Sequence, residues 1–168
     1  MALDTNGEED VVAEARRRGE LAVQAVLAAC GGLWSARTVG ARLGLSTSTV
    51  RRWRREFRLL AIRLPDRRAF RYPAAQFSPP VNADGRVRVP PELRDVLSVA
   101  AGHLAPMELL AKLALPLPGL AEGLSAASSG FDALHAGDGA FVVTLVRHLT
   151  TRDDADAPLL AACDEAQW

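Results

Sequence analysis

The chain has 168 residues, 49% of them hydrophobic and 24% charged, which is typical of a folded globular protein and argues against a disordered or fibrous one. Its apolar runs fall far short of the roughly 20 residues of a membrane span, and its acidic start is unlike a secretory signal, so we expect a cytoplasmic protein with no membrane partner. The net charge is zero, but residues 31–72 hold eleven arginines against two acids between acidic flanks, which indicates a polyanion-binding segment.

Three helices are expected in the N-terminal part of the chain. Their sequences open with acids or follow a serine, both of which favour a helix start, and the first two end at glycines. The expected ranges are 8–30, about 36–43 and about 47–58.

The next segment, residues 59–73, predicts a β-hairpin with Pro65-Asp66 in its turn. Prolines then mark where later helices begin or end. Helices are expected near 91–104, 105–115, 131–136 and 139–150. In the last of these the apolar residues Phe141, Val142, Leu145, Val146 and Leu149 form one face. The expected fold is therefore mainly α: an N-terminal helix-turn-helix with a small β-hairpin, followed by a small C-terminal helical domain.

Residues 36–55 carry the frame of a helix-turn-helix. Gly44 supplies the left-handed conformation that the turn requires, and Gly40 allows the two helices to approach closely. Ser35 and Ser46 are good N-caps. The positions that must be apolar for the pair to pack hold Val39, Leu43, Leu45, Val50 and Trp53.

The second helix of this motif has an apolar side for packing and a basic side that suits the major groove. We expect Thr47, Ser48, Arg51, Arg52 and Arg55 to face the bases, and Arg54 and Arg58 to contact phosphates. Arg67 and Arg68 of the hairpin would touch the DNA as a wing. The alternatives are a solvated basic helix in an all-α bundle and a plain surface hairpin.

The sequence offers no catalytic or metal-binding motif. His103, His135 and His148 are scattered, and Cys30 and Cys163 are too few for a disulfide framework. It contains no nucleophile elbow, glycine-rich phosphate loop or paired carboxylates. We therefore expect no enzyme, no cofactor and no metal.

Five segments follow one another in a recognisable order from about Gly31 to Leu149. They are GGLWSARTVGARLGLSTSTVRRWRREFRLLAIR, FRYPAAQF, DGRVRVPPEL, APMELLAKLALPLPGL and GFDALHAGDGAFVVTLV. In this order they resemble the antitoxins of the Xre/MbcA/ParS group. Ala75 and Met107 stand where that group usually has tryptophans, and Gly130-Phe131 stands where it usually has Pro-Leu.

The resemblance implies an antitoxin of a type II toxin–antitoxin system. Such a protein binds and silences a cognate toxin, commonly a RES-domain enzyme that consumes NAD, and represses its own operon through the helix-turn-helix. The alternative is a stand-alone helix-turn-helix transcription regulator whose C-terminal domain dimerises or senses a ligand. The expected parts are a helix at 1–30, the DNA-binding domain at 31–77, the toxin-binding domain at 78–150 and an acidic tail at 151–168.

Two interfaces are expected besides the one with operator DNA. One helix-turn-helix reads few base pairs, so we expect a homodimer formed through helices 8–30 and 138–150. In the tail, Asp153 and Asp154 would steer toward a basic cleft of the toxin, and Leu159, Leu160 and Trp168 would anchor there. The alternative is a solubilising tail.

Overall fold

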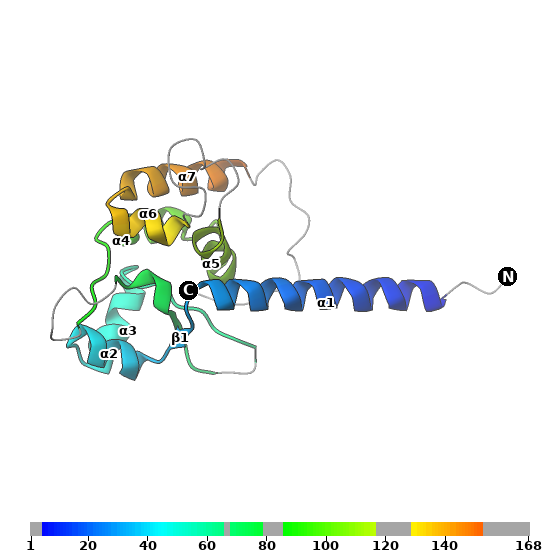
Figure 1. Ribbon diagram of the computed structural model, residues 1–168, viewed down its shortest axis with the longest axis horizontal. Helices are drawn as coiled ribbons and strands as arrows, with labels where there is room; N and C mark the ends of the chain where they lie inside the picture. The colour runs from blue at the N-terminus through cyan, green and yellow to red at the C-terminus, as the bar shows by residue number, and fades with distance from the viewer. Residues whose placement is uncertain (1–4, 66–67, 79–85, 117–128, 153–168) are drawn as a thin grey trace.

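The computed structural model describes residues 5–65, 68–78, 86–116 and 129–152, and this part is mainly helical with one small antiparallel sheet, as the sequence predicts (Figure 1). None of its helices is long and apolar enough to cross a membrane. The elements are α1 (Thr5–Ala29), β1 (Leu33–Trp34), α2 (Ala36–Leu43), α3 (Thr47–Arg55), β2 (Tyr72–Pro73), the 3-10 helix η1 (Ala74–Gln76), α4 (Leu93–Ala100), α5 (Pro106–Ala114), α6 (Gly130–Ala136) and α7 (Gly139–Arg152).

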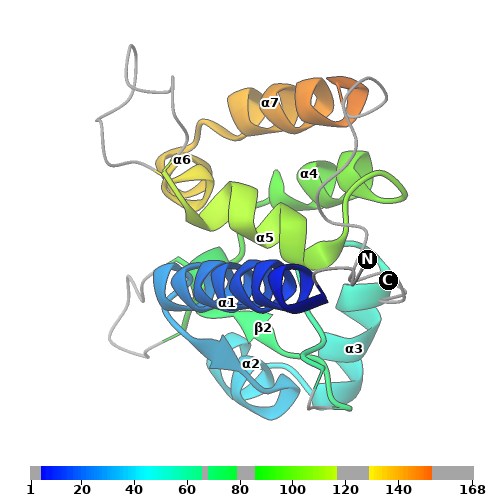
Figure 2. The ribbon, with the colours of Figure 1, turned by 90° about the vertical axis from the view of Figure 1, so that its right-hand side faces the viewer.

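Two hydrophobic cores lie on either side of the chain that leaves α3. Figure 2 shows α2, α3 and β2 on one side of α1 and α4–α7 on the other. The helix-turn-helix core contains Val39, Val50, Leu59, Ala61, Tyr72, Phe77 and Val87. The second core, the helical core, joins the end of α1 to α4, α5, α6 and α7 through apolar side chains that include Val26, Cys30, Leu97, Leu110, Phe131 and Val142.

The segment 59–62 takes part in both cores. Leu59 and Ala61 are buried in the helix-turn-helix core, whereas Leu60 and Ile62 are buried in the helical core. This alternation is what an extended chain produces, because successive side chains point to opposite faces. One short segment therefore fastens the two halves together.

The expected hairpin pairs at a single bridge. Ile62 and Arg71 exchange two backbone hydrogen bonds of 2.8 Å, but the chain beyond Arg71 pairs with β1, where Trp34 lies opposite Tyr72. In the hairpin register the next partner of Leu60 would be Pro73, which has no N–H to donate. The second arm consequently becomes β2 of the sheet with β1.

The side chain of Gln76 replaces the hydrogen bonds that Pro73 cannot make. Leu60 N–H donates to Gln76 Oε1 at 2.9 Å, and Gln76 Nε2 donates to the carbonyls of Leu60 at 2.9 Å and Pro73 at 3.1 Å. Gln76 is fully buried, and these three bonds satisfy its amide.

Helix α7 packs differently from the sequence expectation. Val142 and Val146 are buried in the helical core, and Leu145 and Leu149 are half-buried. Phe141, expected on the same buried face, is 44% exposed. Because periodicity shows only that one face is apolar, it could not show that this flank lies outside the contact with the other helices.

Candidate nucleic-acid interface

The turn between α2 and α3 has the geometry that a helix-turn-helix needs. Gly44 caps α2 in the left-handed conformation, with φ of 70°. At Gly40 a Cβ atom would lie 2.6 Å from the carbonyl oxygen of Leu45, and Leu45 N–H donates to the Gly40 carbonyl at 2.8 Å. The two glycines that the sequence singled out are thus required, one for the turn and one for the close approach.

Serine caps fix the start of each helix. The Ser35 hydroxyl accepts from Thr38 N–H and the Ser46 hydroxyl accepts from Thr49 N–H, both at 3.1 Å. Of the five apolar positions predicted to pack the pair, Val39 and Val50 are fully buried and Leu43, Leu45 and Trp53 are half-buried. This packing sets which side of α3 is left to solvent.

The exposed side of α3 is polar and basic. The side chains of Thr47, Ser48, Arg51, Arg52 and Arg55 are all exposed, whereas Val50 is buried. Arg52 Nε lies 3.7 Å from Glu56 Oε1, but an exposed pair of this kind is weak and opens at little cost. The residues expected to face the bases therefore share one accessible face.

Aromatic rings hold the arginines at the edge of this face. The guanidinium carbon of Arg54 lies 3.9 Å from the ring centroid of Phe70, and that of Arg63 lies 4.7 Å from the same ring. The guanidinium carbon of Arg58 lies 3.9 Å from the Trp53 ring. These cation–π contacts attract each guanidinium to the face of its ring and so restrict where its charge lies.

The charges of α3 also reach the buried Tyr72. Burial raises the pKa of the Tyr72 phenol, and the positive charges of Arg54 and then Arg51 oppose that rise. Both arginines therefore lie close enough to β2 to act on it electrostatically.

Comparison with known proteins bears on this fold. No protein-family model matches the chain, and no curated protein matches it. The NMR structure of Rv2175c resembles the protein with a TM-score of 0.54 and 26% sequence identity, over 70% of this chain and 80% of that one. The two chains thus share a fold over most of their length.

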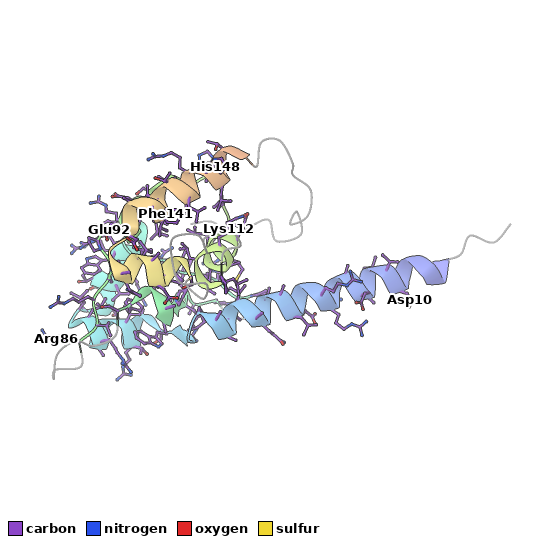
Figure 3. The ribbon with its side chains drawn as sticks, turned by 45° about the horizontal axis from the view of Figure 1, so that its top comes forward. Asp10, Arg86, Glu92, Lys112, Phe141 and His148 are labelled. Atoms are coloured by element: carbon purple, nitrogen blue, oxygen red, sulfur yellow. The ribbon has the colours of Figure 1, made fainter. Side chains whose placement is uncertain are left out.

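Two further arginines that the sequence analysis did not single out lie at the helix-turn-helix. The guanidinium of Arg42 lies 4.9 Å from the Trp34 ring, which stacks on Phe77 with centroids 5.0 Å apart. The guanidinium carbon of Arg86 would lie 3.4 Å from a Cβ atom placed on Gly44. Figure 3 shows Arg86 at the end of the molecule that carries α2 and α3.

Residue 86 reaches the turn because its chain segment runs beside α2. Val87 N–H donates to the carbonyl of Arg42 at 3.2 Å, and Val87 is buried while Arg86 and Arg88 are exposed. The alternation in the sequence RVRV was the signal that could have indicated a buried valine between exposed bases. The pattern could not show that this segment lies beside α2.

The remaining predicted site residues divide into two groups. Arg68 is exposed beyond the Ile62–Arg71 bridge. Arg67 lies outside the described residues. So do all the predicted toxin contacts, which are Asp153, Asp154, Leu159, Leu160 and Trp168.

Among the described residues, no group of three or more His, Cys, Asp or Glu side chains could hold a metal ion. His103 and His148 are exposed, and His135 Nε2 bonds the Ala75 carbonyl oxygen at 2.7 Å. Cys30 is buried, its thiol donates to the Leu27 carbonyl at 3.1 Å, and burial raises the pKa of that thiol. A buried thiol of raised pKa is a poor nucleophile.

Proposed function

We propose that the protein is a DNA-binding transcription regulator that reads the major groove with α3. The observation that carries the proposal is the side of α3 left to solvent. Val50 is buried, and Arg51, Arg52 and Arg55 are exposed to solvent. The helix that carries them follows a tight turn in which Gly44 is left-handed, as a helix-turn-helix requires. Arginine is the side chain best suited to bidentate contact with guanine.

The arginines around α3 support the same role. Arg54, Arg58 and Arg63 are held over aromatic rings beside the exposed face, where they would meet the sugar-phosphate backbone. Arg86, placed at the turn by its packing near Gly44, adds positive charge next to the start of α3. Direct readout by α3 and backbone contacts around it would then fix one register on the duplex.

The test is a selection of bound sequences from a random duplex library, followed by anisotropy titrations on the selected duplex and on a scrambled one. We expect Arg51→Ala to weaken binding to the selected duplex by about 1–3 kcal/mol and to leave binding to the scrambled duplex nearly unchanged. Arg58→Ala should weaken both equally and reduce the slope of the salt dependence.

The matched control is Arg94→Ala, which removes the same charge from an exposed position on α4. It should leave both affinities unchanged. Equal losses on both duplexes for Arg51→Ala would exclude base readout by that residue, and an absence of any selected sequence would contradict the proposal.

The narrower proposal is that this regulator is the antitoxin of a type II toxin–antitoxin system. It rests on the resemblance of the ordered segments to the Xre/MbcA/ParS group, and the exposed Phe141 on α7 favours it (Figure 3). A large exposed aromatic side chain on the C-terminal helices is suited to anchor a protein partner.

Co-expression with the product of the adjacent gene tests this role. We expect the two products to co-purify, the partner to be toxic alone, and Phe141→Ser to weaken the complex without changing DNA affinity. Deletion of residues 153–168 then shows whether the tail or the α4–α7 part neutralises the toxin. DNA binding without a toxic neighbour would favour the stand-alone regulator.

A further inference from the structure

Only the C-terminal end of helix α1 packs on the body of the protein, and the rest of the helix projects away from it (Figure 1). Val26 and Cys30 are buried and Leu27 is half-buried against the helical core, whereas the side chains from residue 10 to residue 25 are exposed except for the half-buried Glu14. Figure 3 shows Asp10 far out on this helix, away from every other element. Helices in proteins draw most of their stability from packing an apolar face, so this projection calls for a partner.

The face of α1 that packs on the body continues along the projecting turns. At 100° per residue, Val11, Ala15, Gly19, Ala22 and Val26 fall on one side of the helix. We call this side, with the flanking Val12 and Val23, the α1 strip. Val11 is 69% exposed and Val12 is 68% exposed. The α1 strip is thus an interface at its C-terminal end and uncovered at its N-terminal end.

We propose that the α1 strip is covered by the same strip of a second copy of this chain, with the two helices antiparallel. The charge order of α1 selects this occupant. Residues 8–10 are all acidic and residues 16–18 are all arginine. An antiparallel pair centred near residue 13 places each acidic block beside the arginine block of the other copy.

The same pairing is self-complementary in its apolar contacts. Val11 of one copy lies level with Ala15 of the other, and the reverse contact follows from the two-fold axis. A parallel pair would place residues 16–18 of both copies at the same level, which brings like charges together. The acidic block, the arginine block and the apolar strip of one α1 thus match those of a second α1. Binding to an unrelated protein would give no reason for this self-complementary order.

The first test is the mass of the full chain by sedimentation equilibrium over micromolar concentrations. We expect the wild-type protein at twice its 18.0 kDa chain mass, and Val12→Asp to weaken the dimer at least tenfold. The matched control is Leu21→Asp, because Leu21 is 60% exposed but lies on the opposite side of α1. It should leave the dimer intact.

A monomeric wild-type protein, an unaltered dimer in Val12→Asp, or an equal loss in Leu21→Asp would overturn the proposal. With Trp168 changed to Phe in every protein compared, the fluorescence of Trp34 and Trp53 in the helix-turn-helix core checks that each variant keeps its folded body. The test does not involve DNA, so its failure is distinct from failure of the proposed function.

Cross-linking tests the orientation of the helices. With Cys163 changed to Ser, Val12→Cys should form an intermolecular disulfide under mild oxidation, and Ala22→Cys should not. In the antiparallel pair the two copies of residue 12 are offset by about 3 Å along the axis, but those of residue 22 are about 27 Å apart, far beyond the reach of a disulfide. Cross-linking at residue 22, or at neither position, would overturn the antiparallel pairing.

Discussion

The side chain of Gln76 makes hydrogen bonds that a neighbouring β-strand would otherwise make. Its amide donates to the carbonyls of Leu60 and Pro73 and accepts from Leu60 N–H. It thus fills the place of the ladder bonds that proline removes at position 73. The interaction spans 16 residues of sequence and depends on the register of the Ile62–Arg71 bridge. No local pattern in FRYPAAQF could have predicted it.

Replacing Gln76 with leucine should destabilise the protein strongly. The N–H and C=O of Leu60 would lose their side-chain partner in a buried position, at about 1–3 kcal/mol for each group left unpaired. Urea denaturation followed by circular dichroism measures the change. Gln24→Leu, the same substitution at an exposed site on α1, should stay within about 0.5 kcal/mol of the wild type, and a similar small effect at position 76 would contradict the assigned role.

At the scale of elements, local signals predicted the starts of α2 and α3 and the turn between them. Ser35 and Ser46 begin the two helices and Gly44 ends α2, and each acts within one turn of chain, so the sequence shows them directly. The end of α3 was predicted less well: the helix stops at Arg55 rather than near Arg58, because Phe57 takes a left-handed conformation with φ of 53°. The hairpin was less well predicted, because the backbone of β2 has a competing partner in β1. Likewise the approach of Arg86 to Gly44 depends on tertiary packing, which leaves no periodic trace in the sequence.

We expect opposite effects when each of two helical glycines, Gly40 and Gly19, is replaced with alanine. Gly40→Ala should destabilise the protein by about 1–3 kcal/mol, since its methyl would meet the Leu45 carbonyl oxygen and push α2 away from α3. Gly19→Ala should preserve or raise helix content, because nothing lies within 4 Å of the added methyl and alanine favours helix by about 1 kcal/mol. Thermal unfolding monitored at 222 nm compares the two. Equal effects would show that the close approach at Gly40 is unimportant.

At the scale of the whole molecule, several contacts join the helix-turn-helix core to the helical core. Segment 59–62 contributes side chains to both cores. The Gln76 amide bonds Leu60, and His135 of α6 bonds the Ala75 carbonyl of η1. The sequence placed a boundary near residue 77, between the expected DNA-binding and toxin-binding parts. These contacts connect the two parts across that boundary.

A substitution in the helical core should therefore also unfold the helix-turn-helix. Leu109→Ala removes a fully buried side chain on α5 and should cost about 2–5 kcal/mol. With Trp168 changed to Phe, tryptophan fluorescence reports only Trp34 and Trp53, which belong to the helix-turn-helix core. We expect this fluorescence and the far-ultraviolet circular dichroism to move together to a lower urea midpoint, because coupled cores unfold in one transition. A tryptophan transition that stays at the wild-type midpoint, while the circular dichroism separates into two steps, would show instead that the halves fold independently.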